Sequence, residues 1–127
     1  MANIKKIENN NAEELRAAEQ AVGSDSVLLD EQPDGMYTHK FAEPIQYDGK
    51  TFDKLTFDFD SLTGGDSLDV ESELLSKGHA VVVRTIDGEY LSRMCARACT
   101  ESVGADIFRH MKVKDYGQIT NVAKRFF

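Results

Sequence analysis

Residues 36–59 read MYTHKFAEPIQYDGKTFDKLTFDF, two runs rich in β-branched and aromatic residues that flank the dipeptide Asp48-Gly49. An Asp-Gly pair between two such runs is a strong local signal for a β-hairpin with a two-residue turn. We therefore predict strands over residues 36–47 and 50–59. A two-residue turn at this point pairs Ile45 with Phe52 and Tyr47 with Lys50.

The same pairing fails farther from the turn. It would place Phe57 opposite Lys40 and would leave Phe41 and Phe57 on different faces, although both side chains suit a core. We therefore predict that the register shifts by one residue. The shift would come from a bulge near residues 53–54, or from a break at Pro44, which has no N–H to donate.

Helical patterns follow the hairpin. Thr63 and Asp66 are spaced almost as in a capping box, and Gly78 is a typical terminator, so the first helix is predicted over residues 64–77. Its half-apolar face consists of Leu68, Glu71, Leu74 and Leu75. The β-branched run at residues 80–83 weakly favours a short strand.

The clearest helix is predicted over residues 87–102. Its apolar stripe consists of Tyr90, Leu91, Met94, Cys95 and Ala98. Shorter helical patterns cover residues 105–111 and 115–127, and Lys124 and Arg125 suit the negative end of the last helix dipole.

These elements define an α+β domain over residues 36–127, a β-hairpin followed by a small bundle of about four helices, because strands and helices do not alternate. Residues 1–35 are expected to form a flexible or weakly helical N-terminal extension. Residues 1–11 are too polar to order by themselves, whereas Asn11 and Gly23 suit the two ends of a short helix over residues 12–22.

The net charge of −7 is unevenly distributed. Residues 1–78 hold 17 acidic and 7 basic side chains (−10), and residues 79–127 hold 5 acidic and 8 basic ones (+3). This balance disfavours nucleic acid, which usually requires a clustered basic surface. The asymmetry suits self-association or a partner of opposite polarity, and it equally suits two solvated surfaces.

The longest unbroken apolar run covers residues 80–83, far less than the roughly 20 residues that span a bilayer, so no membrane association is expected. The N-terminal residues lack the pattern of a secretory signal, and Cys95 and Cys99 lie four positions apart within a predicted helix. Both features favour a reducing cytoplasm.

The sequence contains fragments of catalytic and cofactor-binding motifs, but residues that these motifs require are missing at the required positions. Gly49-Lys50-Thr51 lacks the first glycine and the following helix of a phosphate loop, and the acidic run from Asp58 lacks the glycine and glutamate of a calcium loop. Cys95, Cys99 and His110 would need His39 or His79 to complete a zinc site, and they lack the partners of a cysteine nucleophile. We therefore expect a non-catalytic binding protein without a metal or cofactor.

Large apolar side chains stand at the C-terminus, where chains usually fray. They could anchor the last helix, which the small number of other aromatics favours, or dock on a partner as an amphipathic helix. The candidate partner-binding residues are Phe57, Phe59, Tyr116, Ile119, Phe126 and Phe127.

The run from Glu43 to Phe57, EPIQYDGKTFDKLTF, and the later run Leu62-Thr63-Gly64-Gly65-Asp66 together resemble the tail assembly chaperones of long-tailed bacteriophages. In that family a Pro-Ile-x-Tyr-x-Gly-Lys hairpin leads to a Leu-Thr-Gly-x-Asp helix start, and the chain finishes on a helix ending in apolar residues. The resemblance covers residues 36–127. Residues 1–35 have no counterpart in it, and residues 79–87 match it poorly.

The resemblance implies a chaperone that binds the tape measure protein in the host cytoplasm, keeps it soluble and helps to recruit major tail tube protein. Such a chaperone leaves before the virion is complete. The alternative is a structural phage tail or head-completion protein, which would remain in the particle.

Overall fold

A β-hairpin opens the part of the chain that the computed structural model describes, residues 34–127. Strands β1 (Met36–Tyr47) and β2 (Lys50–Asp58) are antiparallel. Asp48 and Gly49 both have positive φ, 54° and 77°, as a type I′ turn requires. The predicted hairpin is confirmed, whereas the expectations for residues 1–33, including the helix over 12–22, lie outside the described residues.

The register of the hairpin shifts between Lys40 and Ile45. Near the turn Ile45 pairs with Phe52, as predicted, but farther out Tyr37 pairs with Phe57. The residue numbers of paired positions sum to 97 near the turn and to 94 beyond the break, so the shift is three residues and the predicted size of one was wrong. Four residues of β1, including Pro44, lie opposite Asp53 alone, so the extra length is on β1.

The outer edge of β2 is partly covered by the chain that follows the second long helix. Cys99 forms an antiparallel bridge with Phe57, and the Thr100 N–H donates to the Thr56 carbonyl at 2.8 Å. The Thr56 N–H donates in turn to Oε1 of Glu101 at 3.0 Å. Backbone and side-chain groups of residues 99–101 therefore satisfy this part of β2.

Helix α3 (Gly64–Ser76) begins with a complete capping box. The Thr63 N–H donates to the Asp66 carboxylate at 2.8 Å, and the Asp66 N–H donates to the Thr63 hydroxyl at 3.2 Å. The chain turns out of the helix at Gly78, whose φ of 85° favours glycine.

The buried face of α3 differs from the predicted one. Val70 and Leu74 are buried and pack with Tyr90 and Met94, whereas Leu68 and Leu75 are exposed. The expectation for Leu74 is confirmed and that for Leu68 and Leu75 was wrong. Two apolar stripes compete on this helix, and packing against the next helix selects the Val70–Leu74 stripe.

Residues 80–83 do not form the predicted strand. They run as irregular chain into a 3₁₀ turn, η3 (Arg84–Ile86). Within residues 34–127 the sheet consists of β1 and β2, so this run has no neighbouring strand to pair with. Strand propensity without a partner does not produce a strand.

Helix α4 (Gly88–Ala98) is capped by Asp87, whose carboxylate accepts from the Tyr90 N–H at 3.0 Å. All five residues of its predicted apolar stripe are buried, which confirms that face. The helix ends four residues before the predicted end at 102, because residues 99–101 are used to cover β2.

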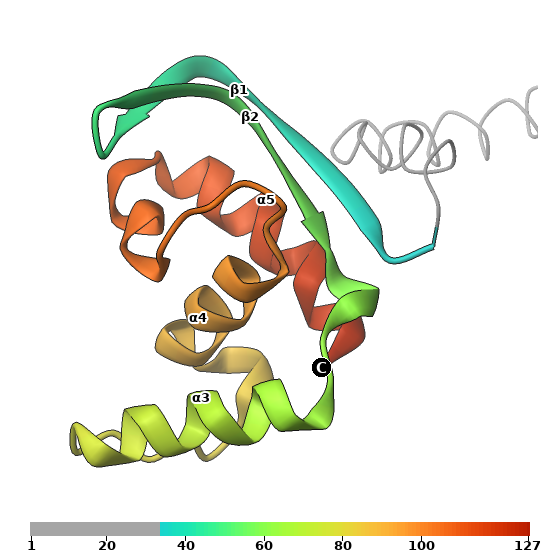
Figure 1. The fold of residues 1–127 in the computed structure, drawn as a ribbon, viewed down its shortest axis with the longest axis vertical. Helices are drawn as coiled ribbons and strands as arrows, with labels where there is room; N and C mark the ends of the chain where they lie inside the picture. Colours follow the sequence, from blue (N-terminus) through green and yellow to red (C-terminus); the bar gives the residue numbers. More distant parts are fainter. Residues whose placement is uncertain (1–33) are drawn as a thin grey trace, which may run out of the picture. The chain divides into compact units, whose positions relative to one another are not determined.

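The C-terminal region forms a 3₁₀ segment η4 (Ala105–His110), then helix α5 (Val113–Ala123), then a 3₁₀ turn η5 (Lys124–Phe126). The segments predicted over 105–111 and 115–127 are present, but the first is a 3₁₀ segment that ends at His110 and the second begins two residues earlier, at Val113. Figure 1 shows the hairpin arched over α5, with α4 below it and α3 on the far side. The α+β arrangement of a hairpin followed by a small helical bundle is therefore confirmed.

Ion pairs join the acidic and basic parts of the sequence. Arginines of η3 and α4 contact acidic residues of α3. These pairs are Arg84–Glu71 at 2.7 Å, Arg93–Glu73 at 3.5 Å and Arg97–Asp66 at 2.8 Å. Some carboxylates of the acidic part of the sequence are thus paired with arginines of the basic part within the fold. None of the helices in residues 34–127 has the length and apolar character needed to cross a bilayer.

Candidate functional site

Most of the six candidate partner-binding residues have a packing role in this fold. Phe57, Phe59 and Ile119 are buried, and the rings of Phe57 and Phe59 stack with centroids 5.6 Å apart. A direct contact between these three side chains and a partner would require the core to open. The remaining three are Tyr116, Phe126 and Phe127.

The two C-terminal phenylalanines lie against the core. The Phe126 ring stacks on Phe59 at 5.3 Å but stays partly exposed, and the Phe127 ring meets Tyr90 edge-on at 5.8 Å. Phe127 also packs against the cluster that joins α3 to α4. This geometry is that of an anchor, the interpretation favoured from the sequence.

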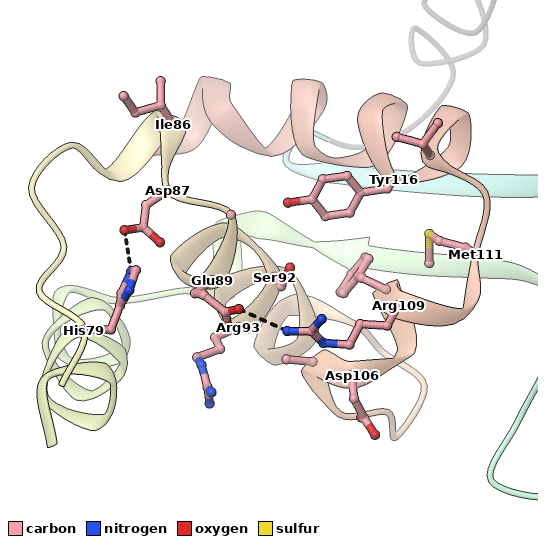
Figure 2. A pocket seen from close by; sticks show the side chains of 14 residues that line it. His79, Ile86, Asp87, Glu89, Ser92, Arg93, Asp106, Arg109, Met111 and Tyr116 are labelled. Carbon is pink, nitrogen blue, oxygen red and sulfur yellow. Dashed lines mark hydrogen bonds and ion pairs between the residues drawn. The ribbon is translucent and has the colours of Figure 1, made fainter. Parts of the chain in front are cut away.

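Tyr116 differs from the other five candidates because it lines a pocket of about 680 Å³ (Figure 2). The first two turns of α4, the segment η4 and the start of α5 form its walls, and His79 and Ile86 also line it. Because this concave surface includes one of the six candidates, we take it as the candidate site.

The pocket has an aromatic and aliphatic lining. The Tyr116 ring meets the Phe108 ring edge-on at 6.0 Å, and Phe108 is buried. Gly88 opens α4 beside them, and a Cβ at Gly88 would lie 3.1 Å from the Tyr116 hydroxyl oxygen. Ile86 and Val113 also line the pocket, yet their side chains are 75% and 82% exposed. We call these two side chains the apolar rim of the pocket.

One polar pair in the lining is fully engaged. His79 Nε2 lies 2.7 Å from Oδ2 of Asp87, while the other carboxylate oxygen caps α4 through the Tyr90 N–H. Burial raises the pKa of Asp87, but the hydrogen bonds from the Tyr90 N–H and from His79 outweigh it and hold the pKa below its usual value. Asp87 is therefore occupied with structural contacts.

Two arginines of the lining form ion pairs and differ in their exposure to solvent. The Arg109 guanidinium contacts Glu89 at 3.1 Å, but the Arg109 side chain is 75% exposed (Figure 2). Arg93 reaches Glu73 at only 3.5 Å, and its buried Nε has no acceptor among the described residues. The Arg93 side chain is only 23% exposed and is paired with α3, so Arg109 is the more accessible arginine of the lining.

The hairpin holds one wall of the pocket in place. The Tyr47 hydroxyl donates to Oδ1 of Asp106 at 2.6 Å and accepts from the Gly104 N–H at 3.2 Å. The hydrogen bond to Asp106, and then burial, raise the pKa of Tyr47 above its usual value. β1 thereby fixes η4, which carries Phe108 and Arg109.

The two cysteines considered for metal or nucleophile chemistry are shielded from solvent. Cys95 is buried in α4, and Cys99 donates to Glu101 at 3.3 Å. Burial raises the pKa of the Cys95 thiol, and it raises the pKa of Cys99 to about 12. Within residues 34–127 no group of three or more His, Cys, Asp or Glu side chains is arranged to hold a metal ion.

Reasoning from sequence found Tyr116 but missed the residues that accompany it, above all Ile86, Val113 and the two arginines. One local signal existed, because Ile86 directly precedes the cap residue Asp87, where an apolar side chain often packs onto the helix. Ile86 is exposed, however, so it does not pack onto α4 in this way. Comparison of the chain with family models, curated proteins and solved structures finds no significant match.

Proposed function

We propose that this protein is a tail assembly chaperone of a long-tailed bacteriophage. In this proposal it binds the tape measure protein in the host cytoplasm, helps to recruit major tail tube protein, and is absent from the mature virion. It acts by binding, without catalysis and without a cofactor.

The main support for this proposal is the order of the motifs that resemble those of the tail assembly chaperones. The run from Pro44 to Lys50 surrounds the hairpin turn, the run from Leu62 to Asp66 opens α3, and an apolar-ended helix closes the chain. Each motif falls on the kind of element that the resemblance implies, since Asp48-Gly49 forms the turn and Thr63 caps a helix. The pocket with its exposed apolar rim supplies a surface that a client could occupy.

Co-expression with the tape measure protein encoded in the same phage genome tests the proposal. We expect the tape measure protein to move from the pellet to the soluble fraction and to co-purify with this chain. Equal solubility with and without this chain would overturn the proposal.

Mass spectrometry of purified virions separates a chaperone from a structural component. A chaperone is absent from finished particles, whereas a tail or head-completion protein is present at a fixed ratio to the other structural proteins. Stoichiometric recovery from particles would favour the structural alternative.

A further inference from the structure

We infer that the outer stripe of α3, which consists of Leu68, Ser72 and Leu75, is a contact surface for a second copy of this chain. In this dimer the two copies of α3 lie antiparallel across a two-fold axis close to Ser72. The inference goes beyond the proposed function and does not depend on it, because it concerns how two copies of the chain meet and not which client they bind.

The outer stripe is apolar and lies opposite the packed face of α3. The helix packs on the rest of the domain through Val70 and Leu74, whereas the side chains of Leu68 and Leu75 are 65% and 62% exposed. Residues at positions i, i+4 and i+7 share one face of a helix, so Leu68, Ser72 and Leu75 form a continuous row. In Figure 1, α3 lies at the end of the domain away from the hairpin.

The segment that follows α3 adds apolar surface beside this stripe. Nε of Arg84 donates to the Glu71 carboxylate at 2.7 Å, so this segment returns along the helix. Its residues Val82 and Val83 are exposed. Within residues 34–127, four of the seven exposed large hydrophobic side chains therefore belong to α3 and the segment that follows it.

The spacing of the outer stripe makes it complementary to itself. When two copies of α3 lie antiparallel with the axis near Ser72, Leu68 of each copy meets Leu75 of the other. The spacing of seven residues keeps both leucines in the seam between the helices, and the small Ser72 at the centre permits close approach. Such a self-complementary patch is what a two-fold interface requires.

The charges at the two ends of the helix are complementary in the same way. Asp69 is 72% exposed and reaches Arg97 at only 4.0 Å, while Arg97 is held by Asp66 at 2.8 Å, so one carboxylate is in excess near the start of α3. Lys77, the C-cap residue, is exposed and forms no ion pair within residues 34–127. Antiparallel pairing places Lys77 of each copy beside Asp69 of the other.

The charges near the two-fold axis favour a second copy over a basic client. Glu71 and Glu73 are the carboxylates closest to the axis, and they are already paired with Arg84 at 2.7 Å and with Arg93 at 3.5 Å. Two copies therefore meet without a row of bare carboxylates between them, and a basic client finds no such row to bind.

Sedimentation velocity of the full chain tests the inference. We expect a reversible monomer–dimer equilibrium that depends on concentration, and a weak one, because a contact through one helix face is small. Leu75→Asp should raise the dissociation constant of the dimer roughly tenfold or more, since the substitution occurs twice in a two-fold interface. Val113→Asp places the same charge at an exposed apolar side chain outside α3 and should leave the dissociation constant unchanged. Melting temperatures at low concentration verify that both variants are folded.

Two cysteine variants test the antiparallel geometry. Ser72→Cys brings two thiols together at the axis, so mild oxidation should give a disulfide-linked dimer. Ser76→Cys is exposed on the same helix, but its two copies would lie about 13 Å apart along the helix axes and should not cross-link. The wild-type chain, whose own cysteines are shielded, is the control.

A charge exchange tests the complementary ends of the helix. Lys77→Glu should weaken the dimer about threefold, because two exposed ion pairs become repulsive. Adding Asp69→Lys to the same chain restores opposite charges across the axis and should restore the dissociation constant. A double variant as weak as Lys77→Glu alone would contradict the pairing of Asp69 with Lys77.

The outcomes separate this inference from the proposed function. A chain that stays monomeric at every concentration, a dimer that Leu75→Asp leaves unchanged, or equal cross-linking of Ser72→Cys and Ser76→Cys would overturn the inference. A monomeric chain that loses the tape measure protein on Leu75→Asp substitution would assign the outer stripe to the client and would also overturn it. Failure of the wild-type chain to solubilise the tape measure protein would overturn the proposed function alone.

Discussion

Nε2 of His39 lies 2.8 Å from Oδ1 of Asp115, a contact that joins β1 to the first turn of α5 across 76 positions of sequence. The imidazole is buried, and its Nδ1 lies 2.8 Å from the Tyr37 hydroxyl. Both ring nitrogens of His39 are therefore satisfied inside the protein. The contact holds α5, which carries Tyr116, against the hairpin.

Replacing His39 by alanine should lower the free energy of unfolding by about 2–4 kcal/mol, because it leaves the largely buried Asp115 carboxylate without its partner. Urea denaturation followed by circular dichroism measures the change. Lys114→Ala, at an exposed position beside Asp115, is the control and should change stability by less than about 0.5 kcal/mol. Equal losses in the two variants would argue against a structural role for the His39–Asp115 contact.

The choice between the two apolar stripes of α3 gives a second prediction. Leu74→Ala should cost about 2–5 kcal/mol, since it opens a cavity against Tyr90 and Met94. Leu75→Ala removes the same atoms from an exposed position and should cost less than about 0.5 kcal/mol. Chemical denaturation of both variants measures the difference, and a larger loss at Leu75 would contradict the packing described for α3.

The capping box gives a pH-dependent prediction. The Thr63 N–H, and then Arg97, hold the pKa of Asp66 below its usual value. A carboxyl whose pKa is lowered by folding stabilises the fold above its unfolded pKa, about 3.9, and this stabilisation is lost as pH falls through the folded pKa. Asp66→Asn should therefore lower the melting temperature at pH 7 and have a smaller effect at about pH 3.

A matched variant separates the cap from the charge. Thr63→Ala should cost about 1 kcal/mol, because the Asp66 N–H at the start of α3 loses its acceptor. It should also weaken the pH dependence, since the hydroxyl donates to the Asp66 carboxylate at 3.1 Å. A melting-temperature difference for Asp66→Asn that stays constant between pH 7 and pH 3 would refute the role of the Asp66 charge.

Local signals in the sequence are sufficient for the hairpin and for the helix starts. Asp48-Gly49 fixes the turn, and Thr63 and Asp87 cap their helices, because these effects involve residues no more than a few positions apart. The predicted stripe of α4 is correct for a similar reason, since one apolar face dominates that helix.

Features that depend on distant residues could not be predicted as well. The spacing of the expected core residues on the two strands shows that the register must shift by an odd number of residues. A shift of one residue and a shift of three residues satisfy this condition equally. On α3 the sequence offers Leu68 and Leu75 as readily as Val70 and Leu74, and only the position of α4 decides. The pocket is likewise made by three segments meeting in space, so Tyr116 was identified without Ile86 or Val113.

Thiol reactivity provides a further prediction. Burial raises the pKa of Cys99 to about 12, and Cys95 is more deeply buried in α4. At pH 8 the native chain should react with a thiol reagent on the order of a thousandfold more slowly than the chain unfolded in urea, with Cys99 ahead of Cys95. Absorbance kinetics on Cys95→Ala and Cys99→Ala measure each thiol separately. Fast reaction of native Cys95 would contradict its placement in the core.

The C-terminal phenylalanines test anchoring against docking. Phe127→Ala should lower the free energy of unfolding by about 2 kcal/mol, because Phe127 fills the space beside Tyr90 and Phe59. Phe126→Ala should cost about half as much, since that ring is partly exposed and contacts Phe59 on one face. Denaturation curves measure both changes. If Phe127→Ala kept full stability but lost the tape measure protein on co-expression, the last turn would be a client-binding element, and the anchoring role assigned to it would be wrong.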